Sequence, residues 1–385
     1  SSPAGQDQSS RISGDWHSSA TEPLPAGRQP EFHAGLDLGI APANTRLDRM
    51  LLLLEPLPAQ QRALDGFLQA QLTSGNCAYH QWLTPAQFAD RFSNSASDVS
   101  TVAGWLAEQG FSVAPLPAGR GWIEFSGTAA QVEQAFGAAV HGYSTTAGTR
   151  YTLTNSIRVP AVFVPLIRGL VSLDGALSVP ALTTLQAVAT TPSALAGISS
   201  PGQAEALTPE LLAPILHLDA LHASGVTGAG ESIAIASRSN IQAADIAAFR
   251  ATFGLPAGTV SVAPNGHDPG LTADQAEAEL AASWAGAAAP DAKIVVVPSA
   301  STAATDGVDL SLAAIVDQDR AHTLVVDFSS CEAALNDAHV AFYAAIYRQA
   351  SAEGIAAIAA SGDSGAAACH APGSSALVSS GLAVN

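Results

Sequence analysis

Residues 277–294 read Glu-Ala-Glu-Leu-Ala-Ala-Ser-Trp-Ala-Gly-Ala-Ala-Ala-Pro-Asp-Ala-Lys-Ile. The alanine-rich part predicts a helix over Thr272–Ala287, and the Ala-Pro pair separates it from an apolar strand at Lys293–Pro298. Further apolar runs lie at Ser232–Ala236, Leu324–Phe328 and Ile355–Ala360, and further helical stretches at Ala243–Phe253, Val308–Ala321 and Ala333–Glu353. This alternation predicts an α/β unit with a doubly wound parallel sheet and right-handed crossovers.

The first half of the chain has a different pattern, typical of a small α+β domain. Strands are expected at Leu51–Leu54, Gly121–Phe125 and Tyr151–Asn155, and helices at Pro58–Leu72, Asp98–Gln109 and Ala129–Phe136. The chain therefore divides into a flexible leader (residues 1–43), this domain (44–176), a nearly uncharged linker suited to processing (177–207) and the α/β unit (208–385).

The composition limits the partners of the protein. Its 385 residues carry 15 Lys and Arg against 33 Asp and Glu, a formal charge of −18. Such an excess of negative charge argues against nucleic acid and anionic membrane surfaces as partners, and no apolar run is long enough to predict a membrane span. A surface rich in carboxylates suits a secreted protein that works in acid, where these groups lose their charge.

The first half of the chain contains several motifs with specific spacings. Residues 79–88 read Tyr-His-Gln-Trp-Leu-Thr-Pro-Ala-Gln-Phe, and related patterns follow at Val102–Phe111, Phe125–Thr128, Ile157–Pro160 and Leu173-Asp174. Together they resemble the activation prodomain of the sedolisin family, the serine-carboxyl peptidases, in its kumamolisin-like form. The resemblance implies a ferredoxin-like prodomain that inhibits its own enzyme, followed by a subtilisin-like catalytic domain that cleaves polypeptides.

The second half resembles the beginning of that catalytic domain at Thr227–Ile235, at Asp245–Pro256 and at Ser361–Cys369. The resemblance implies that Glu277 is the general base and that Asp363 stabilises the oxyanion as a protonated carboxyl. Without the resemblance, Glu277 would be interpreted as a surface helical residue and Asp363 as part of a polar turn. A subtilisin triad is not expected, because residues 237–240 read Ser-Arg-Ser-Asn where its Asp would be needed.

Three departures from the family bear on activity. The family places an Asp four residues after the Glu, one helical turn along the same face, and here that position is Ala281. Asp274 and Glu279 are not placed to substitute for it. The segment expected to line the substrate cleft reads Asp327-Phe328-Ser329 instead of Ser-Tyr/Trp-Gly, and Asp327 itself could replace the lost carboxyl.

The third departure concerns the nucleophile. The family's Gly-Thr-Ser motif and its calcium site belong to a later region, so calcium is expected for the complete domain but its site is not expected within these residues. The resemblance also implies a disulfide between Cys331 and Cys369, with two free thiols as the alternative, and leaves Cys77 over. Two functions remain open: a secreted acid-acting endopeptidase zymogen, and a non-catalytic homologue that binds polypeptides or assists folding.

Overall fold

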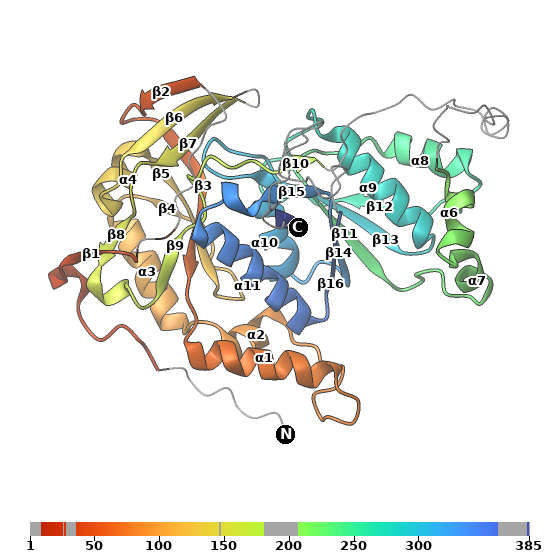
Figure 1. Ribbon diagram of the computed structural model, residues 1–385, viewed down its shortest axis with the longest axis horizontal. Coiled ribbons are helices and arrows are strands. Elements are labelled where there is room, and N and C mark those ends of the chain that lie inside the picture. The colour runs from red at the N-terminus through yellow and green to blue at the C-terminus, as the bar shows by residue number, and fades with distance from the viewer. Residues whose placement is uncertain are drawn as a thin grey trace, which may run out of the picture.

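A computed structural model describes residues 9–25, 27, 36–145, 148–180, 207–360 and 383–384. Two units are packed together (Figure 1). The N-terminal unit comprises the described residues up to 180, and the C-terminal unit comprises residues 207–360. Figure 1 shows helices α10 and α11 between the antiparallel sheet of the first unit and the parallel sheet of the second.

The N-terminal unit is built on a four-stranded antiparallel sheet in the order β4-β5-β3-β9. Its elements are β3 (Arg46–Leu54), α3 (Ala96–Glu108), β4 (Ser112–Val113), β5 (Trp122–Thr128), α4 (Ala129–Phe136) and β9 (Ile167–Leu170). In chain order these elements give the β-α-β-β-α-β pattern of ferredoxin-like domains. Helix α4 starts at a capping box in which Thr128 and Gln131 bond each other's backbone N–H groups.

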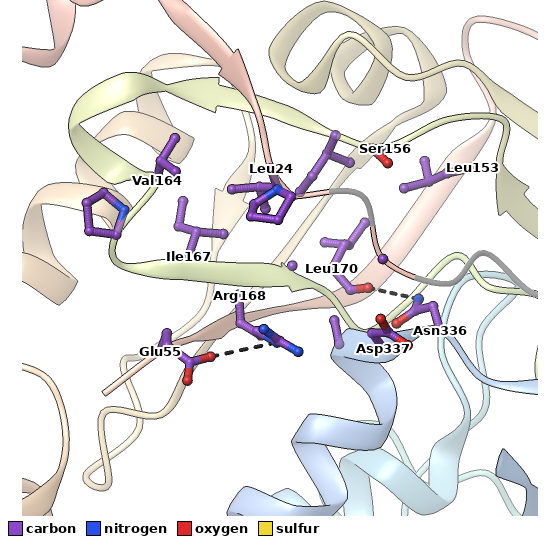
Figure 2. A pocket seen from close by; sticks show the side chains of 16 residues that line it. Leu24, Glu55, Leu153, Ser156, Val164, Ile167, Arg168, Leu170, Asn336 and Asp337 are labelled. Atoms are coloured by element: carbon purple, nitrogen blue, oxygen red, sulfur yellow. Dashed lines mark hydrogen bonds and ion pairs between the residues drawn. The ribbon is translucent and has the colours of Figure 1, made fainter. Parts of the chain in front are cut away.

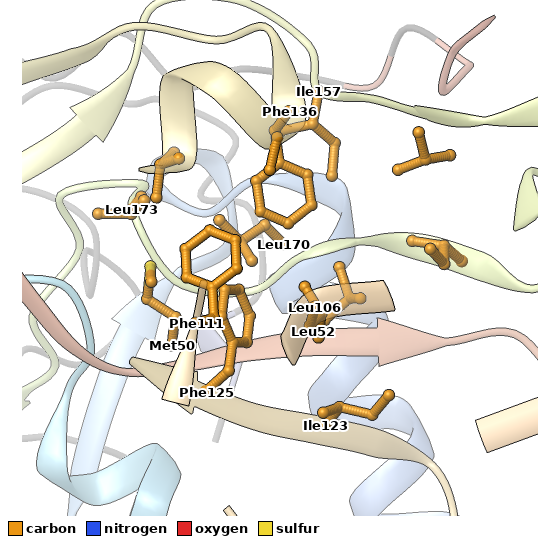
Figure 3. Packing of buried hydrophobic residues seen from close by; sticks show 14 of the residues in the cluster. Met50, Leu52, Leu106, Phe111, Ile123, Phe125, Phe136, Ile157, Leu170 and Leu173 are labelled. Atoms are coloured by element: carbon orange, nitrogen blue, oxygen red, sulfur yellow. The ribbon is translucent and has the colours of Figure 1, made fainter. Parts of the chain in front are cut away.

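Both faces of this sheet are buried, which explains the unbroken apolar run in β3. Leu52 and Leu54 point into a core with α3 and α4, where the rings of Phe111, Phe125 and Phe136 gather beside Met50 (Figure 3). Leu51 and Leu53 lie on the opposite face, because side chains alternate along a strand. They join Trp122, Val171 and the α11 residues Phe342 and Ile346 in a second core.

Further elements surround this sheet. They are β1 (Thr21–Pro23), β2 (Leu36–Ile40), α1 (Pro58–Leu72), α2 (Pro85–Phe92), β6 (Val140–Thr145), β7 (Gly148–Leu153), β8 (Arg158–Pro160) and two 3₁₀ turns, η1 (Trp16–Ser18) and η2 (Ala161–Phe163). Strands β2, β6 and β7 form a separate three-stranded sheet. Helices α1 and α2 pack against the end of α11 through a small apolar cluster around Ala352.

The flexible leader expected over residues 1–43 is wrong for the part that the structure describes. Strand β1 pairs with β8, and Leu24 is buried. Ser10 donates a hydrogen bond of 2.5 Å to Asp98, which also accepts from the backbone of Arg11. Composition could not predict this, because the partners of these residues lie far along the chain.

The C-terminal unit contains the expected parallel sheet. Its five strands run in the order β12 (Thr259–Val262), β13 (Lys293–Pro298), β11 (Ser232–Ser237), β14 (Thr323–Val326) and β16 (Ala356–Ala359). Helices α8 (Ala243–Thr252) and α9 (Gln275–Ala288) cover one face, and α10 (Gly307–Asp317) and α11 (Asp337–Glu353) cover the other. Two short helices, α6 (Pro209–Ile215) and α7 (Leu218–Ala223), precede β11.

One predicted strand is divided in the structure. The run Leu324–Phe328 forms the end of β14, a break at Asp327 and the beginning of β15 (Phe328–Cys331). Strand β15 leaves the parallel sheet and lies between β10 (Val179–Pro180) and β17 (Ala383–Val384), antiparallel to both. The apolar pattern is continuous across the break, so hydrophobicity alone did not indicate it.

Among the residues that the structure describes, no helix is long and apolar enough to cross a membrane.

Candidate functional site

The first site feature is a cavity of about 500 Å³ between α9 and the parallel sheet. Glu277, in the first turn of α9, and Ala281, one turn later, both line it. Their side chains are 2 % and 5 % exposed. The prediction that these two positions share one face is therefore confirmed, whereas the alternative of a surface position for Glu277 is wrong.

A second carboxyl group lines the same cavity. Asp327 follows the last residue of β14 and is half-buried. Burial raises its pKa above the ordinary value, because the charged form loses water. Most of the remaining wall is apolar, formed by Ile233, Leu280, Trp284, Val325 and Ile358, among others. The cavity thus places two carboxyl groups and the methyl group of Ala281 in largely apolar surroundings.

The strand next to this cavity holds an extended segment of the chain. Val179 and Pro180 of β10 pair antiparallel with Ser329 and Phe328 of β15. Phe328 and Ser329 belong to the segment that the sequence predicts as the substrate cleft. The first residues of the predicted linker therefore lie along this strand, in the extended conformation that a bound polypeptide adopts in β-augmentation.

Ser178 anchors that segment in a buried network of charged residues. Its backbone N–H and its hydroxyl each donate a hydrogen bond of 2.6 Å to Oδ2 of Asp306, the N-cap residue of α10. Arg238 lies 3.3 Å from the same oxygen and donates to Asp274 at 2.7 Å. Its guanidinium also stands over the ring of Phe328, 4.8 Å from the centroid.

The charges of this network stabilise each other. Burial alone raises the pKa of Asp306, but Arg238 and the two donors of Ser178 more than reverse this, so the pKa lies below its ordinary value. Burial lowers the pKa of Arg238, and the carboxylates of Asp306 and Asp274 raise it above its ordinary value. Asp274 is therefore engaged by Arg238 at the start of α9.

Residues 37–175 match the family model of the pro-kumamolisin activation domain. These residues are therefore similar to a pro-kumamolisin activation domain, and we refer to them as the prodomain. A search of the curated proteins finds no match to the chain. The match begins before residue 44, the expected start of the prodomain, so it includes residues 37–40 of β2.

The prodomain contacts the C-terminal unit through a buried histidine that the sequence reasoning missed. His339 of α11 lies between two carboxylates: Nδ1 is 2.7 Å from Asp174 of the prodomain, and Nε2 is 3.1 Å from Asp309 of α10. Burial lowers the pKa of His339, but the charges of Asp309 and Asp174 raise it well above its ordinary value. Tyr343 adds a hydrogen bond of 2.7 Å to Asp309. His339 is therefore a buried cation shared by both units.

A second polar contact joins a prodomain loop to the end of α10. The backbone N–H groups of Ala118 and Gly119 donate to the two carboxylate oxygens of Asp317, at 3.0 and 2.7 Å. Burial raises the pKa of Asp317, and the two hydrogen bonds offset only part of this effect. Protonation of Asp317 would remove an ionic acceptor from this contact.

A cavity of about 370 Å³ lies where the prodomain meets the beginning of α11 (Figure 2). Arg168 faces Glu55 across 3.7 Å, and Asn336 donates to the carbonyl of Leu170. Its walls consist mainly of prodomain residues, with Asn336, Asp337 and Ala338 from the other unit. We assign it to the contact between the two units and not to the candidate active site.

Some predicted residues lie outside the described ranges. Asp363 and Cys369 are among them, so the role of Asp363 and the pairing of Cys331 with Cys369 stay predictions. Cys331 ends β15, and Cys77 is an exposed free thiol. Within the described ranges, no three His, Cys, Asp or Glu residues are grouped so that they could hold a metal ion.

Proposed function

We propose that the chain is the zymogen of a secreted, acid-acting serine-carboxyl endopeptidase with a subtilisin-like catalytic fold, and that its substrates are polypeptides. The observation that carries this proposal is the course of the chain where it leaves the prodomain. Ser178, Val179 and Pro180 run along β15, beside the cavity that contains Glu277. The segment that leaves the prodomain pairs with β15, the strand next to the buried Glu277 carboxyl group. A prodomain placed in this way is suited to inhibit its own enzyme in cis.

The proposed chemistry assigns separate roles to the two family carboxyl groups. Glu277, buried at the beginning of α9, would accept the proton of the nucleophile as general base. Asp363 would donate a hydrogen bond to the developing oxyanion, which requires its protonated form. No nucleophile is assigned within these residues, because no Gly-Thr-Ser occurs in them.

Action in acid is supported by the carboxyl groups of the folded protein. Burial raises the pKa of Asp327 above its ordinary value and, helped by the charges of Asp319 and Asp317, raises that of Glu353 to about 8. Groups with raised pKa values hold protons in the folded state, and they therefore favour that state at lower pH.

The second candidate is a non-catalytic homologue that binds polypeptides or assists folding. Ala281 favours it, because this position lines the cavity beside Glu277 and presents only a methyl group. The family's hydrogen-bonded carboxyl chain therefore cannot form between these two positions.

The test begins with the encoding gene, read past Asn385 for a Gly-Thr-Ser motif and an Asp-rich calcium segment. The encoded protein is then incubated at about pH 4 with denatured protein, and self-cleavage and peptide release are followed by mass spectrometry. Activity that disappears in Glu277→Gln supports the peptidase. Activity that appears only in Ala281→Asp, and not in the matched Ala281→Asn, identifies position 281 as the lesion. Inactivity of every variant refutes the enzyme and favours the binding function.

A further inference from the structure

The outgoing segment of the prodomain is recognised by a side chain as well as by its backbone. Ser178 is 4 % exposed, although Val179 beside it is 61 % exposed. The two residues belong to one extended segment, so the structure encloses the serine and leaves the valine in solvent. Strand pairing with β15 is independent of sequence, and the contacts of Ser178 are therefore the selective ones.

The environment of Ser178 demands a small hydrogen-bond donor. An ionised carboxylate only accepts hydrogen bonds, and Oδ2 of Asp306 receives both the N–H and the hydroxyl of Ser178. Nη1 of Arg238 in turn donates to the serine hydroxyl at 3.3 Å. Asp306 and Arg238 are 3 % and 7 % exposed, which leaves little space for a large side chain. An apolar residue would leave the buried carboxylate with one donor fewer.

The same pair is linked to the candidate active site. Arg238 binds Asp274, which immediately precedes α9 and lies three residues before Glu277. The aromatic ring under its guanidinium belongs to Phe328, the residue of β15 that pairs with Pro180. A hydroxyl side chain at the position of Ser178 therefore contacts Asp306 and Arg238. Through Arg238 it is linked to the residue that precedes the Glu277 helix and to strand β15 of the cleft.

We propose that Asp306 and Arg238 form a specificity subsite that selects a serine-sized hydroxyl side chain in an extended polypeptide bound along β15. In the zymogen, Ser178 occupies this subsite in cis. The proposal rests on the proposed function for the statement that β15 is the strand that binds substrate.

The first test measures how firmly the segment is docked in the 385-residue chain. Hydrogen exchange of peptides covering residues 176–180 and 326–331 is compared in wild type, Ser178→Ala and the matched control Val179→Ala. Loss of a hydrogen bond to a buried charged group should raise the opening equilibrium constant about tenfold or more. The control should change it no more than about twofold, because the valine side chain is exposed. Equal protection of Ser178→Ala and wild type would overturn the proposal.

The second test measures selection in trans. The Ser178→Ala chain is titrated with the labelled peptide Ala-Leu-Ser-Val-Pro-Ala and with its Ser-to-Ala version, and binding is followed by fluorescence anisotropy. The serine peptide should bind about tenfold more tightly or better. Asp306→Asn should abolish the preference; Asn can still cap α10, and circular dichroism of the variant checks that it is folded. Equal affinities, or binding of neither peptide, contradict the proposal.

The proposed subsite and the proposed endopeptidase activity can fail separately. Preference for the serine peptide without any peptidase activity would keep the subsite and refute the endopeptidase. Peptidase activity without that preference would refute the subsite alone.

Discussion

Substitution of Asp174 by Asn tests whether the buried histidine holds the prodomain on the C-terminal unit. Asp174 is the only prodomain carboxylate that contacts His339 in the described residues, at 2.7 Å, and both side chains are almost fully buried. Asn has nearly the same shape but carries no charge. The substitution therefore removes one of two counter-charges and leaves the packing intact.

The structure sets the expected magnitude. Removal of one partner from a buried ion pair typically costs about 3–5 kcal/mol, because the remaining charge stays buried. His339 retains Asp309 at 3.1 Å, so the loss should lie near the lower limit. We expect the free energy of unfolding to fall by about 3 kcal/mol at pH 6, which is roughly a hundredfold change in the unfolding equilibrium constant.

The pH dependence follows from the direction of the histidine shift. The pKa of His339 in the folded state lies well above the ordinary value of 6.5. Its contribution to stability is therefore complete below pH 6.5 and is lost as the pH rises through the folded-state pKa. The difference between wild type and Asp174→Asn should be largest near pH 6 and should shrink in alkaline solution.

Urea unfolding followed by circular dichroism at pH 6 and at pH 9 measures this difference. Asp15→Asn is the matched control, because Asp15 also lies 2.7 Å from a histidine, His17, but both side chains are exposed. The control should leave stability unchanged within error. A loss below about 1 kcal/mol at pH 6, or a difference that grows with pH, would show that the Asp174–His339 ion pair does not stabilise the contact between the two units.

Three other predictions concern Glu353, Gly307 and the cysteines. Glu353 has a pKa of about 8 in the folded state against 4.5 ordinarily, so the free-energy cost of its burial is absent below pH 4.5 and grows up to about pH 8. Glu353→Gln should therefore be more stable than wild type by about 2–4 kcal/mol at pH 8 and equal to it at pH 4, measured by urea unfolding. A Cβ at Gly307 would lie 2.1 Å from the carbonyl oxygen of Ser299, so Gly307→Ala should lower the free energy of unfolding by at least about 2 kcal/mol in the same assay. Peptide mapping without reduction should find Cys331 linked to Cys369 and Cys77 alkylated.

Each of these has a control or a contrary outcome. A stability gain for Glu353→Gln that is the same at pH 4 and pH 8 would show that the effect is not one of ionisation. Gly66→Ala, in helix α1 where nothing lies within 4 Å of an added Cβ, should be neutral or stabilising by up to about 1 kcal/mol. Alkylation of all three cysteines without reduction would contradict the disulfide.

Local signals predicted much of the secondary structure. Pro58–Leu72 and Ala129–Phe136 have the same bounds in the structure as in the prediction, since Pro begins the first helix and a capping box begins the second. The alternation of strands and helices also predicted the parallel sheet, although it missed β12 and the break at Asp327. These errors arise because a short half-exposed strand and a bend within an apolar run have no distinct pattern.

For the candidate site, helical spacing was sufficient to place Glu277 and Ala281 on one face. It could not indicate Ser178, Asp306 and Arg238 as one group. Ser178 and Asp306 are 128 positions apart, and Ser178 and Arg238 are 60 apart. Taken singly, each of these residues has the sequence context of an ordinary polar residue in a loop. Their significance depends on which of them are buried together.

The amino-acid sequence alone therefore indicates the local periods, the helix starts and the motifs of the prodomain, because these depend on residues a few positions apart. Tertiary packing establishes which charges meet and where the segment that leaves the prodomain lies. His339 and Asp174 are 165 positions apart, and they meet only because one face of the prodomain sheet packs on α10 and α11. Docking of the two units also places Ser178 at Asp306. Contacts of this kind arise from the packing of whole units and leave no local pattern in the chain.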